Sequence, residues 1–263
     1  MKSGVTRRLA LSLFLLPLLV LSAYGDTIHL GTAGSYAVLA GSTVTNTGSS
    51  VLNGNLGVSA GCAVTGFPPG LVNGTINRCN GPSAQAQRDL TKAYTKAQGL
   101  TPTGTLTGKD LGGMTLTPGV YFFASSAQLT GTLTLNNLGN PNALFVFQIG
   151  STLTTASNSS VVFANSLADK NVFWQVGSSA TLGTTTKFVG NILALTSITL
   201  NTGASITCGS ALARNGAVTL DNNVISGCGS KATVPEPGTM GLMGSGLVLL
   251  AGAAVRRFPR LAY

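Results

Sequence analysis

The sequence predicts a mainly β protein whose chain winds as a solenoid of short, stacked strands. Three observations favour this fold: recurring Thr-Leu pairs, two matching aromatic segments, and a composition with 35 glycines but only 8% charged residues. Small, uncharged residues suit tight corners and repetitive strands better than they suit an ordinary enzyme.

The Thr-Leu pairs indicate the length of one coil. Their leucines recur at about 19 residues, with one longer interval, a period typical of a solenoid whose coils bury their apolar sides by stacking. Side chains alternate along a strand, so an inward leucine predicts an outward threonine before it. We therefore expect one threonine column and one leucine column. The six pairs begin at Thr115, Thr134, Thr152, Thr181, Thr199 and Thr219.

The aromatic segments give a second register. FVFQIG (145–150) and VFWQVG (172–177) align one coil apart, which places Phe147 over Trp174. A β-sandwich with similar short strands is the alternative. The register kept over six coils favours the solenoid.

Residues 82–98 are predicted to form a helix, because Pro82 suits its first turn and Gly99 its end. The narrow apolar stripe predicts a helix that lies along one side of the solenoid, with a partner-binding helix as the alternative. The stripe consists of Ala86, Leu90, Ala93, Tyr94 and Ala97.

The sequence predicts one domain at 26–230, with a separate segment at each end of the chain. Residues 1–25 combine a basic start, an apolar run and a small-x-small cleavage site, so we expect a signal peptide rather than a membrane anchor. At the other end, 231–263 contains an apolar span at 239–255 followed by arginines, which is just long enough to cross a bilayer.

The four cysteines fit an exported protein, because disulfides form in oxidising compartments. Cys208 and Cys228 are one coil apart, and Cys62 and Cys79 bracket a loop. We expect the pairs Cys62–Cys79 and Cys208–Cys228. Metal binding is the rival, but no CxxC spacing exists and His29 lies far away in the sequence. We therefore expect no metal.

Neither a catalytic centre nor a nucleic-acid site is indicated. The carboxylates of the predicted domain are scattered, whereas a glycosidase needs two flanking one bond, and a β-helical lyase needs acids clustered around a cation. The basic residues are spread out without interleaved aromatics, which argues against nucleic acid. We expect no enzyme and no cofactor. The carboxylates in question are Asp26, Asp89, Asp110, Asp169 and Asp221.

Several long segments, in order, resemble the widespread microbial ice-binding protein family. They include LGTAGSYAVLAGSTVTNTG (30–48), VTGFPPG (64–70), LGGMTLTPGVYFF (111–123) and NILALTSITLNTGA (191–204). The resemblance implies a right-handed, discontinuous β-solenoid whose N- and C-terminal coils stack out of sequence order, with a long helix alongside. It also implies that one flat face binds ice.

The family's loose ice-face motif is Thr, then Ala or Gly, any residue, then Thr or Asn. Residues 155–158 fit it fully, 202–205 fit with serine last, and 184–187 depart at two places, so Lys187 is expected to interrupt the face. The resemblance implies these ice-binding residues: Thr155, Ala156, Asn158, Thr184, Thr186, Thr202, Gly203 and Ser205. The second candidate surface is the threonine column of Thr134, Thr152, Thr181, Thr199 and Thr219.

The tail resembles the PEP-CTERM sorting signal of Gram-negative bacteria. Pro235-Glu236-Pro237 precedes the apolar span, and basic residues follow it. The resemblance implies insertion of 239–255 into the inner membrane, cleavage by a sorting protease, and delivery to the outer cell surface or extracellular matrix.

Together these expectations describe an exported monomer that adsorbs to ice crystals and slows their growth and recrystallisation. The alternatives are a structural or adhesive protein of an exopolysaccharide matrix, or a β-helical polysaccharide lyase, which the missing acidic cluster argues against.

Overall fold

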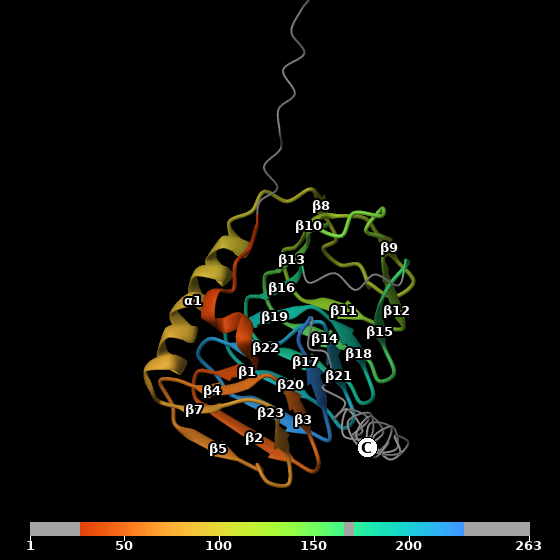
Figure 1. Ribbon diagram of the computed structural model, residues 1–263. Helices are drawn as coiled ribbons and strands as arrows, with labels where there is room; N and C mark the ends of the chain where they lie inside the picture. Colours follow the sequence, from red (N-terminus) through yellow and green to blue (C-terminus); the bar gives the residue numbers. More distant parts are fainter. Residues whose placement is uncertain (1–26, 166–170, 229–263) are drawn as a thin grey trace, which may run out of the picture.

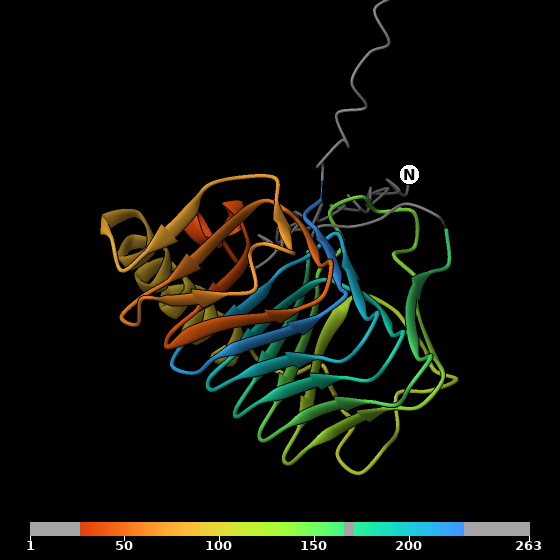
Figure 2. The same cartoon turned by 90° about the horizontal axis from the view of Figure 1, so that it is seen from below.

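The computed structural model describes residues 27–165 and 171–228, which wind into a three-sided solenoid of parallel strands (Figures 1 and 2). Sheet A has the strand order β7 (Ile76–Arg78), β4 (Asn55–Val58), β1 (Tyr36–Ala40), β22 (Ala211–Ala213), β19 (Asn191–Ala194), β16 (Val172–Val176), β13 (Phe145–Ile149), β10 (Gly119–Phe123) and β8 (Gly104–Thr105).

The other two sides are sheets B and C. Sheet B has the order β11 (Ala127–Leu129), β14 (Leu153–Thr155), β17 (Ala180–Leu182), β20 (Ile198–Leu200), β23 (Val218–Asp221), β2 (Thr43–Thr47) and β5 (Ala63–Thr65). Sheet C has the order β6 (Leu71–Val72), β3 (Val51–Asn53), β24 (Val224–Ser226), β21 (Ser205–Thr207), β18 (Lys187–Val189), β15 (Ser160–Phe163), β12 (Thr132–Leu135) and β9 (Thr115–Leu116).

The coils stack out of sequence order, as the family resemblance implies. The first coil, β1 to β3, lies directly on the last, β22 to β24, with Val38 opposite Ala211 and Leu52 opposite Ile225. After β7 the chain crosses to the far end of the stack through the helix and returns coil by coil. The first and last coils therefore meet inside the stack, and β7 and β8 form the two edges of sheet A.

Inward side chains of the three sheets form one continuous apolar core. Phe147 lies over Trp174 with the ring centroids 3.8 Å apart and the planes 7° from parallel, which confirms the predicted register. The indole N–H of Trp174 donates to the carbonyl of Val189 at 3.0 Å, so the buried ring leaves no unsatisfied donor.

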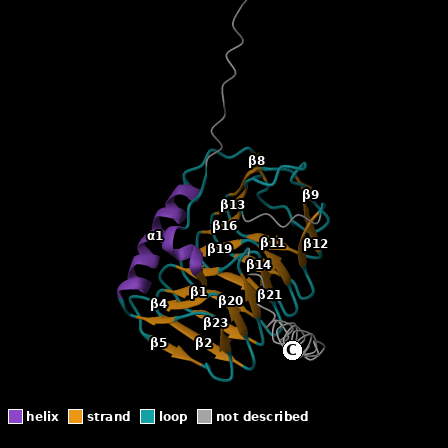
Figure 3. Ribbon diagram, in the orientation of Figure 1, coloured by secondary structure: helices purple, strands orange, loops and turns teal. Residues whose placement is uncertain are grey.

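Helix α1 (Gly81–Gln98) is the single α-helix of the described residues and covers the outside of sheet A (Figure 3). It packs there with the short 3-10 helix η1 (Gly31–Ser35). Asn80 and Ser83 form a reciprocal capping box at its start. At its end, the amide of Gln148 donates to the carbonyls of Ala97 and Leu100 at 2.8 Å. The predicted apolar stripe is buried, which confirms a helix lying along one side of the solenoid.

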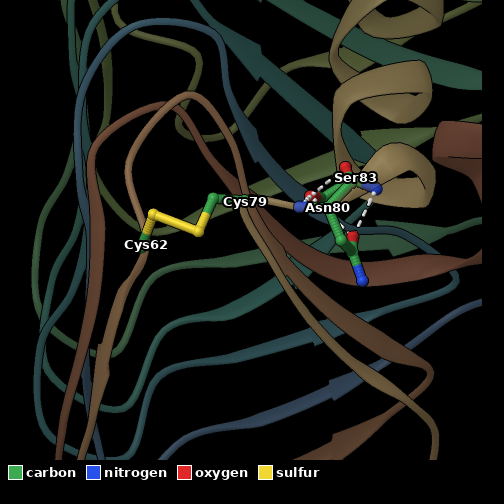
Figure 4. The surroundings of a disulfide bond; sticks show 4 residues. All are labelled: Cys62, Cys79, Asn80 and Ser83. Carbon is green, nitrogen blue, oxygen red and sulfur yellow. Dashed lines mark hydrogen bonds between the residues drawn. A yellow bond between two sulfur atoms is a disulfide. The ribbon is translucent and has the colours of Figure 1, made fainter.

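Both predicted disulfides are present. Cys62–Cys79 ties the residue before β5 to the residue after β7, next to the helix cap Asn80 (Figure 4). Cys208 follows β21 and Cys228 follows β24, and these two strands pair, so the one-coil separation brings the thiols together as predicted.

The prediction that the six Thr-Leu pairs form a single column was wrong. Thr115 and Thr134 pair with each other in sheet C, whereas Thr181, Thr199 and Thr219 pair in sheet B. Leu153 lies opposite Ala180, so Thr152 lies two positions before Thr154, the residue that pairs with Thr181. The physical reason is that the coils differ in corner length, which shifts identical dipeptides to different sides.

Several predicted features lie outside the described residues: the signal peptide at 1–25, the motif Pro235-Glu236-Pro237 and the apolar span at 239–255. Within 27–165 and 171–228, no helix combines the length and apolarity needed to cross a bilayer.

Candidate functional site

The outer face of sheet B carries an unbroken column of small polar side chains, one per strand. Its members, which we call the sheet B column, occupy paired positions on neighbouring parallel strands, about 4.8 Å apart. From β11 to β5 they are Gln128, Thr154, Thr181, Thr199, Thr219, Thr45 and Thr65. Thr181 and Thr199 are half-buried and the others are exposed.

A second column runs beside it, two residues earlier in each coil. All of its members are Ser, Thr or Ala, and side-chain hydrogen bonds link some of them, such as Thr152 to Ser126 at 2.8 Å. Because neither column contains a long side chain apart from Gln128, the face is flat. The second column consists of Ser126, Thr152, Ser179, Ser197, Ala217, Thr43 and Ala63.

The other two faces differ from this one. Helix α1 covers the outside of sheet A. No helix of the described residues packs on sheet C, but its outward side chains include the charged Lys187 and the exposed apolar Leu71 and Val224. Within the described residues, sheet B therefore offers the flat face made of short, neutral side chains.

Thr155 and Thr186 are buried, which corrects their predicted place on a surface. The side chain of Thr155 is 3% exposed and that of Thr186 is 0% exposed. Their hydroxyls hydrogen-bond to each other at 2.8 Å inside the solenoid, and Thr155 also accepts from the backbone N–H of Gly183 at 2.9 Å. Leu153 points inward, so alternation turns Thr155 inward as well.

The exposed motif residues lie on the turns between sheets B and C. Ala156, Asn158, Thr184, Thr202 and Gly203 are exposed there and border the sheet B face. We call this row the B–C ridge.

Hydrogen bonds link successive turns of the ridge. The hydroxyl of Thr185 donates to Asn158, and that of Thr202 donates to the carboxylate of Asp221. Each turn contains a left-handed residue, among them Asn158 with φ 61° and Gly203 with φ 71°. The repeated geometry holds the ridge in register with the sheet.

Ser205 and Lys187 lie on the far side of the ridge. Both belong to sheet C, where they occupy opposite positions on β21 and β18. Lys187 therefore does not interrupt the sheet B columns.

Sequence reasoning missed part of the face, namely Thr43, Thr45, Thr65 and Thr154. The signal for the first two was present, because TVTNT (43–47) alternates threonine with buried side chains as β2 does. Sequence spacing does not show which residues lie beside them, because Thr45 lies opposite Thr219 where the first and last coils meet.

Separate sets of hydrogen bonds hold the three aspartates of the described residues, Asp89, Asp110 and Asp221. Hydrogen bonds from Thr32, chiefly from its hydroxyl, lower the pKa of Asp89, which joins α1 to η1. Burial raises the pKa of Asp110, but hydrogen bonds from Gly112 and Thr130 outweigh it and lower the pKa overall. No group of His, Cys, Asp or Glu that could hold a metal occurs in the described part of the chain.

Fold and surface together define a class of protein: a β-solenoid braced by one helix that presents a flat, threonine-rich face. Comparison with known families then identifies it. Residues 38–226 match the Ice-binding-like family, and the chain belongs to that family. Residues 233–257 match the PEP-CTERM protein-sorting motif.

Similar proteins agree with this assignment. The chain is 63% identical over 235 residues to an ice-binding protein of Nostoc sp. (strain HG1), covering 87% of each. It is 33% identical to an ice-binding protein of Flavobacterium frigoris (strain PS1), covering 76% of each.

Solved structures also match. An ice-binding protein from an Antarctic biological consortium aligns with a TM-score of 0.71 at 45% identity, covering 75% of this chain and 90% of that one. An ice-binding protein from the ascomycete Antarctomyces psychrotrophicus aligns with a TM-score of 0.72 at 42% identity, covering 76% and 97%.

Proposed function

We propose that this protein binds ice through the outer face of sheet B. The observation that carries the proposal is the sheet B column, in which six of the seven paired positions hold threonine. Membership of the Ice-binding-like family supports ice as the ligand. The flatness of sheet B supports its outer face as the surface that contacts ice.

The mechanism follows from rigidity. Each threonine is fixed by its strand, so its ordering entropy is spent during folding and adsorption costs little further freedom. The methyl groups release ordered water on contact, and the hydroxyls offer hydrogen bonds at regular spacing. Many weak contacts add along the sheet, and the adsorbed protein then pins the ice front. This slows crystal growth and recrystallisation without any catalytic group.

The B–C ridge extends this face in our proposal. Thr184 and Thr202 border the sheet B columns, so a lattice seated on the sheet meets their side chains at its edge. Thr155 and Thr186 act indirectly, because their buried hydroxyl pair ties the ridge turns to the core. Ser205 and Lys187 lie outside the proposed contact area.

We infer that the chain is exported and sorted. The PEP-CTERM match supports a sorting protease as a partner and the cell surface or extracellular matrix of a Gram-negative bacterium as the destination. On this proposal, 1–25 is a signal peptide, 26–230 is the ice-binding domain, and the span at 239–255 anchors the protein transiently in the inner membrane. The mature protein is a monomer, and its coil is right-handed, as parallel crossovers almost always are.

Fusion of residues 231–263 to a soluble exported reporter tests the sorting proposal. The reporter should be processed in a host that has the sorting machinery and should stay membrane-bound in one that lacks it. A reporter that stays freely periplasmic in both hosts contradicts the proposal.

Ice crystals grown in solutions of the purified protein test the ice-binding proposal. We expect faceted crystals and slower recrystallisation than in buffer with an equal mass of an unrelated protein. Round, unshaped crystals at every protein concentration would contradict ice binding.

A further inference from the structure

A cavity of about 580 Å³ lies at the corner where sheet C passes into sheet A. Its wall is formed by several connections between these two sheets and by residues of the segment 27–37, which leads into β1. Pockets for small ligands typically enclose about 300–1,000 Å³, so the cavity is large enough to hold one. Each coil runs from sheet A through sheet B to sheet C, so this corner is the one that sheet B does not reach.

The described side chains that line the cavity include many neutral polar groups. None of them is Lys, Arg, Asp or Glu. The imidazole of His29 is exposed and is hydrogen-bonded to the hydroxyl of Thr27 at 2.9 Å. An ionic ligand would therefore meet no lysine, arginine or carboxylate as a counter-charge, whereas a ligand that carries hydroxyl groups would meet both donors and acceptors. Four of the lining residues are asparagines: Asn53, Asn142, Asn171 and Asn191.

One buried hydroxyl on the cavity wall has no partner in the protein. The side chain of Ser210 is 3% exposed, and its hydroxyl makes no hydrogen bond within the described residues. The backbone of Ser210 is fixed, because its carbonyl accepts from the N–H of Ile192 at 2.9 Å. Buried polar groups normally have a hydrogen-bond partner. A ligand in the cavity would supply the one that Ser210 lacks.

Two asparagines differ in how much of their amide is already used. Asn53 donates to the hydroxyl of Ser226 and accepts from Asn73, each at 2.8 Å, so its amide is held in position on the wall. Asn142 is exposed, and its side chain makes no hydrogen bond to the described residues. The cavity thus combines a buried free hydroxyl with an exposed free amide.

The cavity also has an apolar side. Phe173 and Tyr36 line it and are each 3% exposed. Phe173 pairs with Asn191 on the neighbouring strand, which puts an aromatic ring beside an amide. A sugar ring has apolar C–H groups on its faces and hydroxyls around its edge. It therefore matches a wall on which aromatic rings, amides and a hydroxyl lie side by side.

We propose that this cavity binds the neutral sugar rings of a polysaccharide. An acidic polysaccharide would bring carboxylates to a wall without lysine or arginine, and an alkyl chain would leave the hydroxyl of Ser210 without a partner. Binding at the corner between sheets C and A leaves the outer face of sheet B uncovered. The protein can then hold a neutral polysaccharide and ice at the same time.

The test titrates the full-length, exported protein with neutral trisaccharides, by calorimetry and by saturation-transfer NMR. The probes are maltotriose, cellotriose and mannotriose, with trigalacturonate as the charged comparison. We expect at least one neutral trisaccharide to bind, and trigalacturonate to bind about tenfold more weakly or worse, because its carboxylates lose water without gaining a cation.

Single substitutions locate the site. Ser210→Ala removes the unpartnered hydroxyl and should weaken trisaccharide binding about three- to tenfold. It should not lower the thermal stability, because no hydrogen bond within the described residues is lost. Asn142→Ala should weaken binding in the same way. The matched control is Asn215→Ala, which removes an exposed asparagine between β22 and β23, at the corner between sheets A and B, and should bind as the unchanged chain does.

Three results would overturn the proposal: no neutral trisaccharide binds, the Ser210 variant binds as tightly as the unchanged chain, or the Asn215 variant loses as much affinity as the Asn142 variant. Ice shaping at saturating trisaccharide separates this proposal from ice binding. Crystals should stay faceted when the sugar is bound. Round crystals with and without sugar would contradict ice binding and leave the sugar site standing, whereas loss of faceting only with sugar would contradict a site away from sheet B.

Discussion

Replacing Thr199 by tyrosine tests the sheet B face at its centre. Thr199 lies on β20, with Thr181 on one side and Thr219 on the other. Tyrosine is well accepted in strands, and an outward substitution of this kind should change the free energy of unfolding by no more than about 0.5 kcal/mol. The phenol ring, however, stands above the plane of the neighbouring threonines.

The size of the effect follows from the strand spacing. Seven strands at about 4.8 Å make a column roughly 29 Å long. A methyl group contributes about 0.8 kcal/mol when it leaves water, and a gap of about 1 Å already forfeits much of a contact. If the ring separates the ice lattice from between three and five of the threonine side chains, the adsorption free energy falls by about 2–4 kcal/mol. This corresponds to a roughly 30- to 700-fold weaker adsorption.

Ice shaping and recrystallisation rates of the variant give the measurement, with circular dichroism and thermal unfolding as checks on the fold. The matched control is Thr207→Tyr, an exposed outward position on β21 in sheet C. We expect the Thr199 variant to lose nearly all activity and the Thr207 variant to keep it. If only the Thr207 variant lost activity, sheet C would be the ice face. If both variants stayed active, neither sheet B nor sheet C would be the ice face.

Four further predictions concern the ridge and the scaffold. Thr202→Tyr should lose less ice activity than the Thr199 variant, because the ridge borders the face; an equal or greater loss, measured by ice shaping, would place the ridge at the centre. Asp89→Asn should reduce the pH dependence of stability: hydrogen bonds lower the pKa of the folded carboxylate, so its contribution is full above pH of about 4 and is lost as pH falls. Thermal unfolding of both chains from pH 7 to 3 checks this, and parallel curves would contradict it. Gln148→Leu leaves helix carbonyls unpaired and should cost roughly 1–3 kcal/mol in urea unfolding; an unchanged midpoint would show that water replaces the amide. Replacing Cys208 and Cys228 together by serine should cost about 3 kcal/mol, and no change on denaturant unfolding would show that the bridge constrains little.

Much of the fold could be predicted from local patterns. The spacing of Cys208 and Cys228 gave their pairing, and the match of FVFQIG to VFWQVG put Phe147 on Trp174. The stripe that includes Leu90 and Tyr94 gave the helix and its buried side. Each of these rests on residues that lie one coil apart or on one helix, where spacing determines geometry.

The candidate site could be predicted only in part, because its geometry depends on register. Thr155 occupies the first position of a full match to the ice-face motif, yet its side chain points inward because that of Leu153 does. Thr154, which matches no motif, lies opposite Thr181. Corners of unequal length shift the register, and the sequence does not mark which residues belong to a corner.

The contact between Thr45 and Thr219, 174 residues apart, has a consequence for how the chain folds. An ordinary solenoid can nucleate anywhere and can lose a terminal repeat with modest damage. Here the first coils have no stacked partner on one side until β22 to β24 have been synthesised. Such non-local pairing slows folding and leaves strand edges exposed to aggregation. The domain must therefore fold as one late, cooperative unit, and a chain cut before β22 leaves open edges on both halves of its stack.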